Sequence, residues 1–174
     1  MTIEQLRDLV RDVPDFPRPG IVFKDISPLL AHPTGFAAAV EALAARVSQH
    51  ESDSLLAVES RGFIFAAPVA AQLGLPLHLV RKAGKLPHRT VGIEYELEYG
   101  SDRLEVHADV IDPARRYAIV DDVIATGGTA AATSQLLRDN GGVLACYAFV
   151  IELGFLNGRD RLGEYPVESL IRFE

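Results

Sequence analysis

Hydrophobic positions along the chain change their spacing several times. Apolar residues recur at helical intervals in residues 2–12, 34–49, 62–74 and 129–140. Short apolar runs bounded by turn residues occupy residues 55–59, 77–80, 117–120, 143–151 and 167–171. A helical period marks one buried face of a helix, whereas a short apolar run is typical of a buried strand. Strands that alternate with helices predict an α/β fold with a mostly parallel twisted sheet flanked by helices.

Two segments depart from this alternation. At the N-terminus, Thr2 and Gln5 have the spacing of a capping box, which indicates a helix over residues 2–12 that ends before Pro14. Residues 20–28 follow, apolar but interrupted by polar residues, and we interpret them as an extended loop or edge strand and a candidate site. Residues 90–107 alternate apolar and polar positions around Gly100, which predicts an inserted antiparallel hairpin.

The length of 174 residues suits one domain over residues 1–174. We expect an N-terminal arm over residues 1–33 and a core over residues 34–174. The net charge of −7 argues against nucleic-acid binding, although Arg81, Lys82 and Lys85 form a small basic group that suits a compact anionic ligand. One cysteine, no secretory pattern and no run near the ~18 apolar residues of a membrane span indicate a cytoplasmic protein without membrane contact.

The segment 117–129 joins a predicted buried strand to a helix and carries the chemistry. Thr126 to Thr129 offers hydroxyls, glycines and the start of a helix, which together suit a phosphate. Asp121 and Asp122 would repel a phosphate but accept hydrogen bonds from sugar hydroxyls, so the segment indicates a ribose 5-phosphate site. Neither of the commoner nucleotide loops is present, which disfavours ATP hydrolysis and dinucleotide binding. The alternative is an ordinary turn with solvated aspartates.

This segment resembles the phosphoribosyl pyrophosphate (PRPP) signature of the type I phosphoribosyltransferases. Further segments are similar to the adenine branch of that family, in the same order: residues 16–28, 59–63, 81–87 and 97–100. The resemblance implies transfer of the 5-phosphoribosyl group of PRPP to N9 of adenine, which gives AMP and pyrophosphate in purine salvage. It also implies that Asp121 and Asp122 face the ribose hydroxyls, while the 5-phosphate binds at Ala125, Thr126, Gly127, Gly128 and Thr129.

The same resemblance implies how the base is bound. The N-terminal segment would form a hood in which Phe23 stacks on adenine, and Leu153 would close the other side. Main-chain groups of Val22 and Lys24 would bind the adenine edge, where a donor amine lies beside an acceptor nitrogen and hypoxanthine presents the reverse. By composition alone, Phe23 is more typical of a core aromatic.

The resemblance also assigns the groups around the leaving pyrophosphate. Arg61, Arg81 and Lys85 would neutralise its charge, with Arg61 also catalytic, and the family often has a cis peptide at the Arg61 position. Glu98 would manage the purine proton from a flexible catalytic loop over about residues 86–99, in which Tyr99 would also contact PRPP. Without the resemblance, Glu98 is typical of an exposed residue on an alternating strand.

Two further expectations, a metal ion and a homodimer, follow from the resemblance or the residues, and two alternative functions stay open. Mg²⁺ should accompany PRPP, held mainly by substrate oxygens and water because the sequence has no metal cage. A homodimer is implied by the family. The alternatives are a phosphoribosyltransferase for another nucleobase and a PRPP-binding regulator without catalysis, although the latter usually carries a DNA-binding domain, for which this chain has neither length nor basic charge.

Overall fold

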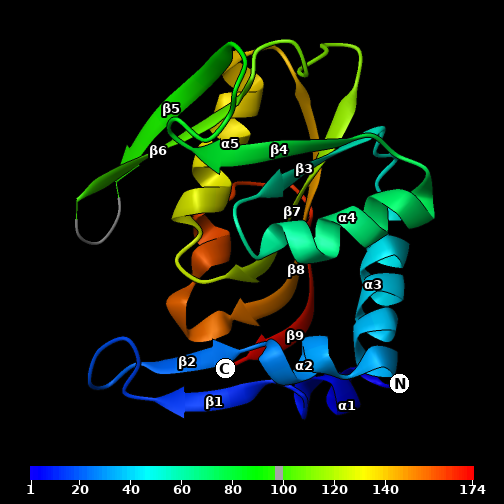
Figure 1. Cartoon of the computed structure of the whole chain (residues 1–174), viewed down its shortest axis with the longest axis vertical. Helices are drawn as coiled ribbons and strands as arrows, with labels where there is room; N and C mark the ends of the chain where they lie inside the picture. Colours follow the sequence, from blue (N-terminus) through cyan, green and yellow to red (C-terminus); the bar gives the residue numbers. More distant parts are fainter. Residues whose placement is uncertain (97–99) are drawn as a thin grey trace.

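The computed structural model describes residues 1–96 and 100–174. Within them, seven strands form one sheet in the order β5-β6-β4-β3-β7-β8-β9 (Figure 1). The parallel strands are β3 (Ser54–Val58), β4 (Leu77–Lys82), β7 (Arg116–Ile124), β8 (Val143–Leu153) and β9 (Val167–Phe173). The sheet confirms the predicted mostly parallel α/β architecture.

Helices cover both faces of the sheet, which explains the long apolar runs in its central strands. On β3, Leu55 and Ala57 belong to a cluster beneath α3 (Pro33–Ser48) and α4 (Gly62–Leu73). Leu56 and Val58 belong to a second cluster that contains α5 (Gly128–Asp139). The predicted helices over residues 34–49, 62–74 and 129–140 are thus confirmed within a residue or two. No helix in the described ranges is both long and apolar enough to span a bilayer.

The antiparallel hairpin is confirmed and extends the main sheet. Strands β5 (Thr90–Glu96) and β6 (Ser101–His107) pair with each other, and β6 pairs antiparallel with the end of β4, where Arg81 lies opposite Glu105. Val91, Ile93 and Tyr95 pack on the cluster that contains α5. Residues 90–96 of the expected catalytic loop therefore form a strand, in which the partly buried Ile93 and Tyr95 alternate with the exposed Glu94 and Glu96. The extent of the loop stays a prediction.

The N-terminal segment differs from the predicted helix over residues 2–12. The capping box of Thr2 and Gln5 is present, but α1 (Ile3–Arg7) is short and is followed by β1 (Arg11–Pro14). Strand β1 pairs antiparallel with β2 (Val22–Asp25), and α2 (Ser27–Ala31) follows. The helix prediction was wrong beyond Arg7, because residues 11–14 form an extended pair with β2. The extended loop or edge strand predicted for residues 20–28 is a strand over Val22–Asp25, whereas Ser27 and Pro28 already belong to α2.

Candidate active site at the carboxyl edge of the sheet

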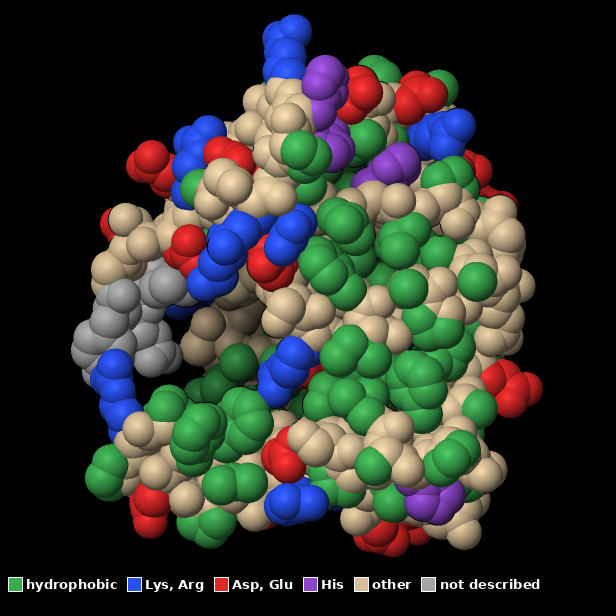
Figure 2. All heavy atoms as spheres, viewed as in Figure 1, with side chains coloured by type: hydrophobic (Ala, Val, Ile, Leu, Met, Phe, Trp, Pro, Cys, Tyr) green, Lys and Arg blue, Asp and Glu red, His purple; other side chains and the backbone are tan. Residues whose placement is uncertain are grey.

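The carboxyl ends of β3, β4, β7 and β8 meet at one edge of the sheet because these strands run parallel. Ligands of open α/β sheets bind at this edge. The β1–β2 hairpin, called the hood below, lies across from it (Figure 1). Figure 2 shows a hollow between the hood and the body of the molecule, with Lys and Arg side chains along its rim. The predicted site residues at the strand ends therefore lie at the edge of the sheet that the hood faces.

Arg61 connects the strand ends to the hood. It is the residue before α4, and its Nε lies 2.8 Å from Oδ2 of Asp122 near the end of β7. Its guanidinium carbon lies 5.1 Å from the centre of the Phe23 ring in the hood. The peptide between Glu59 and Ser60, just before Arg61, is cis. One arginine thus contacts both the acid pair and the aromatic ring of the hood.

The acid pair is held in an environment that disfavours its charge. Burial raises the pKa of Asp121 well above its ordinary value, and the neighbouring Asp122 carboxylate adds to the rise. Burial also raises the pKa of Asp122, although the Arg61 guanidinium opposes this. A Cβ on Gly62 would lie 2.9 Å from Oδ1 of Asp121, so only a glycine lets the start of α4 approach so closely. The positive end of α4 therefore lies beside two crowded carboxylates.

The loop between β7 and α5 has the backbone of an anion site. Gly127 precedes α5 with φ of 78°, a left-handed conformation that glycine adopts without strain. The first N–H groups of a helix have no partner within it, so those at the start of α5 are free to bind an anion. A Cβ on Gly127 would overlap the carbonyl oxygen of Gly158. The loop is therefore fixed both by its own conformation and by contact with the turn around Gly158.

The hood presents an aromatic ring without burying it in a core. Phe23 is half-buried and packs edge-on against Phe16, with ring centres 5.3 Å apart. Val22 and Lys24 lie two residues apart on β2, so their main-chain groups face the same edge of the strand. The Lys24 side chain forms an ion pair with Asp12 and lies over the ring of Phe173. The Lys24 side chain therefore already has partners, and binding of adenine by the main chain of Val22 and Lys24 stays a prediction.

Comparison with known proteins agrees with this arrangement. The model of the phosphoribosyl transferase domain family matches residues 26–153. The adenine phosphoribosyltransferase of Roseiflexus castenholzii is 51% identical over 173 residues, which cover 99% of this chain and 100% of the relative. The chain belongs to the adenine phosphoribosyltransferase family. The resemblance seen in the sequence is confirmed.

Solved structures of adenine phosphoribosyltransferases share the whole fold. That of Thermoanaerobacter pseudethanolicus has a TM-score of 0.95 at 45% identity, covering 99% of this chain and 100% of its own. That of Saccharomyces cerevisiae, complexed with an imino-altritol bisphosphate and adenine, has a TM-score of 0.91 at 38% identity, covering 97% of each chain. The hood and the hairpin are therefore part of the family fold.

Arg81 has a carboxylate partner that the sequence interpretation missed. Its Nε and one terminal nitrogen donate to the two carboxylate oxygens of Glu59 at 3.2 and 3.1 Å, and its other terminal nitrogen donates to the carbonyl of Lys85. The hydrogen bond from Arg81 lowers the pKa of Glu59. The pairing of Val58 with Val80 places the next residues of β3 and β4 side by side. The apolar patterns of β3 and β4 do not specify this register, so the sequence carried no signal for the pair.

The other expected site residues lie as follows. Leu153 ends β8 and packs on the core cluster beneath α3 and α4, half-buried. The Lys85 side chain is exposed beyond the end of β4. Glu98 and Tyr99 lie outside the described residues, so their roles stay predictions. Across residues 1–96 and 100–174, no three His, Cys, Asp or Glu side chains gather as a metal site would require.

Proposed function

We propose that this chain transfers the 5-phosphoribosyl group of PRPP to N9 of adenine and releases AMP and pyrophosphate. The observation that carries the proposal is the ion pair of Arg61 with Asp122, because the same guanidinium lies 5.1 Å from the Phe23 ring and so connects the acid pair with the hood. Family membership supports the proposal, since two relatives that are 51% identical to this chain, and that the alignment covers over their full length, are adenine phosphoribosyltransferases.

The substrate PRPP is assigned to the loop and the acid pair. Its 5-phosphate accepts hydrogen bonds from main-chain N–H groups of the loop between Ala125 and Thr129, at the start of α5. Asp121 and Asp122 accept hydrogen bonds from the ribose hydroxyls, which removes part of the repulsion cost of two adjacent carboxylates. Because Asp122 holds Arg61 from one side, the outward N–H groups of Arg61 remain for the pyrophosphate. Arg81 and Lys85 add positive charge at the next strand end.

Adenine is assigned to the space between Phe23 and Leu153. A base stacked on Phe23 lies beside the guanidinium of Arg61, so it would approach C1 of the ribose from the hood side. Peptide groups of Val22 and Lys24 then pair with the amine and ring nitrogen of adenine, whereas hypoxanthine would set like groups against each other. In the reaction, the bond from C1 to the pyrophosphate oxygen breaks and the bond from C1 to N9 forms. Pyrophosphate leaves with the electron pair, and the Glu98 carboxylate accepts the purine proton.

Mg²⁺, a homodimer and a cytoplasmic location complete the proposal. Two adjacent carboxylates, one of them paired with Arg61, are too few for an all-protein cage but fit a Mg²⁺ held mainly by substrate oxygens and water. Bound there, Mg²⁺ would neutralise pyrophosphate charge. Light scattering of the purified protein tests the dimer: a monomer mass would reject it. Activity that survives chelation by EDTA would reject Mg²⁺.

The test is product stoichiometry. The protein is incubated with Mg²⁺, PRPP and adenine, and AMP and pyrophosphate are measured together. We expect equal amounts of both products, with none when PRPP is omitted. A protein that binds PRPP by calorimetry but makes neither product would be the regulator, and products from uracil or guanine but not from adenine would make it a transferase for another base.

A further inference from the structure

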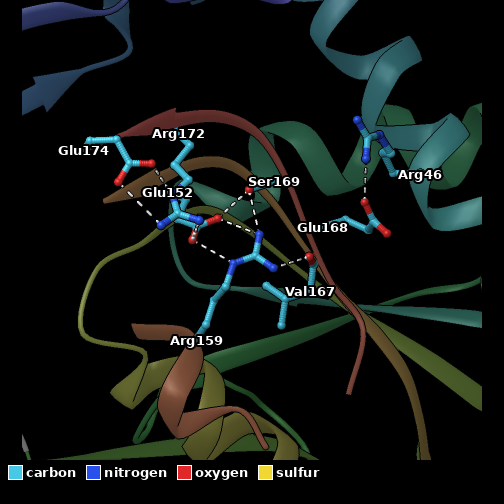
Figure 3. Close-up of polar contacts among 8 residues, drawn as sticks. All are labelled: Arg46, Glu152, Arg159, Val167, Glu168, Ser169, Arg172 and Glu174. Atoms are coloured by element: carbon cyan, nitrogen blue, oxygen red, sulfur yellow. Dashed lines mark hydrogen bonds and ion pairs between the residues drawn. The ribbon is translucent and has the colours of Figure 1, made fainter. Parts of the chain in front are cut away.

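A polar network made of residues that are not themselves assigned to the substrates joins the end of β8, the turn after it and β9. Glu152, next to the end of β8, is only 4% exposed although it is charged. Arg159 donates from Nε and a terminal nitrogen to its two carboxylate oxygens at 2.7 and 2.6 Å (Figure 3). The Ser169 hydroxyl donates to the same carboxylate at 2.5 Å. Both oxygens of this buried carboxylate therefore have charged or polar partners, and the hydrogen bond from Arg159 lowers the pKa of Glu152.

Arg159 comes from a short turn rather than from the sheet. It lies in the 3-10 helix η2 (Gly158–Arg161), which follows η1 (Gly154–Leu156) after β8. A terminal nitrogen of Arg159 also donates to the carbonyl of Val167 on β9 at 2.9 Å. The forked guanidinium thus joins the turn to two neighbouring strands, as Figure 3 shows. Because this fork fixes direction as well as distance, it orients the turn.

The residue before Arg159 packs on the phosphate loop. A Cβ on Gly158 would overlap the carbonyl oxygen of Ala125 and lie 3.0 Å from the Gly127 nitrogen. The contact is reciprocal, since a Cβ on Gly127 would overlap the Gly158 carbonyl. Backbone of the turn therefore lies against backbone of the loop, and the Ile124 side chain packs at the same place, with its Cγ1 3.0 Å from the Cβ position of Gly158. A shift of the turn would move the loop directly.

We propose that Glu152 and Arg159 are positioning residues for the 5-phosphate of PRPP, which they serve by holding Gly158 against the loop Ala125–Thr129. The inference rests on the proposed function for the identity of the phosphate ligand. The Glu152 carboxylate is buried, whereas the Arg159 side chain is 40% exposed. Such an ion pair contributes little net stability compared with apolar residues of the same size, so stability alone explains this network poorly. Backbone donors that are already ordered bind a phosphate without the entropic cost of ordering the loop. A fixed turn against the loop keeps its donors ordered in this way.

The first test is the variant Arg159→Met, with Arg159→Lys as the conservative variant. For Arg159→Met, the KM for PRPP and the dissociation constant of ribose 5-phosphate should rise about 10-fold to 100-fold, the usual effect of a small misplacement in a site. The KM for adenine should change far less. Arg159→Lys keeps the charge but not the fork, so it should restore part of the PRPP affinity.

The second test leaves the ion pair intact. Gly158→Ala forces a Cβ onto the carbonyl of Ala125, so it should weaken ribose 5-phosphate binding as Arg159→Met does. The matched control is Arg46→Met, which removes an ion pair of 2.8 Å with Glu168 on the same strand β9, drawn at the right of Figure 3. The control should change the melting temperature without changing the KM for PRPP.

The outcomes separate this inference from the proposed function. Calorimetry with ribose 5-phosphate needs no turnover. If the wild-type protein makes no AMP, but both variants bind ribose 5-phosphate more weakly than the wild type, only the proposed activity is rejected. If Arg159→Met and Gly158→Ala lower the melting temperature while their affinity for ribose 5-phosphate stays at the wild-type value, the positioning role is rejected. An equal rise in the adenine and PRPP constants would also reject it.

Discussion

Arg61 and Asp122 form an ion pair of 2.8 Å at the place where α4 begins beside the end of β7. Asp122 is 3% exposed, whereas about a third of the Arg61 side chain is open to solvent, at 34%. The buried partner thus fixes the position of the exposed one. Arg61 can therefore bind a second anion without losing the first, as a site for a charged leaving group requires.

Replacing Phe23, the aromatic residue of the hood, should weaken the binding of adenine and leave the binding of PRPP nearly unchanged. Phe23→Ala should weaken adenine binding by about 1 to 3 kcal/mol, the usual contribution of a base stacked on an aromatic ring, with PRPP affinity nearly unchanged. Isothermal calorimetry with each ligand measures both. The matched control is Phe36→Ala, since Phe36 is also half-buried against another phenylalanine but packs in the core. Lower stability with normal adenine affinity in Phe23→Ala would make Phe23 a core residue.

Gly127 should tolerate no side chain. Gly127→Val, or even Gly127→Ala, places a Cβ on the Gly158 carbonyl and requires a strained φ near 78°, so PRPP binding should be lost while the fold persists. Gly74→Ala controls for strain alone, because Gly74 has φ of 66° at the end of α4 and nothing within 4 Å of its Cβ position. Unchanged PRPP affinity in Gly127→Ala would contradict the assignment of the phosphate loop.

The buried Asp121 carboxylate should lower the free energy of unfolding at neutral pH. Its pKa is raised in the folded protein, so folding is disfavoured above that raised pKa and the penalty disappears as pH falls to the ordinary value of 3.8. Asp121→Asn should therefore be more stable than the wild type at pH 7, lose this advantage on acidification, and bind PRPP weakly. Urea unfolding over a pH series measures the difference.

Asp102 is the control for Asp121, because its pKa is shifted in the opposite direction. Its hydrogen bond from Lys82 lowers its pKa, so its contribution to stability is present above 3.8 and is lost as pH falls through the lowered value. Asp102→Asn should be less stable than the wild type at pH 7 and approach it in acid. If Asp121→Asn behaves like Asp102→Asn, the buried acid pair does not carry the electrostatic penalty described above.

Glu98 is predicted to handle the purine proton. Glu98→Gln keeps the size of the side chain but removes the base, so the single-turnover rate should fall roughly 10² to 10⁴-fold with PRPP binding barely changed. Rapid-quench measurement is required because product release or loop opening can limit the steady-state rate. Glu94→Gln, at an exposed position that contacts Arg103 at 3.9 Å, is the control and should keep the wild-type rate. A wild-type single-turnover rate in Glu98→Gln would remove this role.

The buried strands were predictable because helices cover both faces of the sheet, which leaves unbroken apolar runs such as residues 55–58. The N-terminus was less predictable. Leu9 and Val10 have helical spacing and do pack on the core, but the chain is already past α1 at that point. Pairing of Val13 with Phe23 decides the conformation there, and a contact between strands ten residues apart leaves no periodic signal.

The candidate site was predictable where its residues follow one another in the sequence, as in the loop from Asp121 to Thr129. It was not predictable where partners come from different strands. The Glu59–Arg81 and Glu152–Arg159 pairs depend on the strand register and on a turn of two short 3-10 helices. Hydrophobic spacing specifies neither, because a register shift leaves the apolar pattern of a strand buried on both faces unchanged.

The most direct test of the account is the ratio of kcat/KM for adenine to that for hypoxanthine, measured on the wild-type protein with saturating PRPP and Mg²⁺. Main-chain pairing in the hood predicts efficient AMP formation and a preference for adenine of about 10⁴-fold, since the wrong base leaves buried polar groups unpaired. Comparable rates with the two bases, or no AMP from adenine and PRPP, would contradict the account.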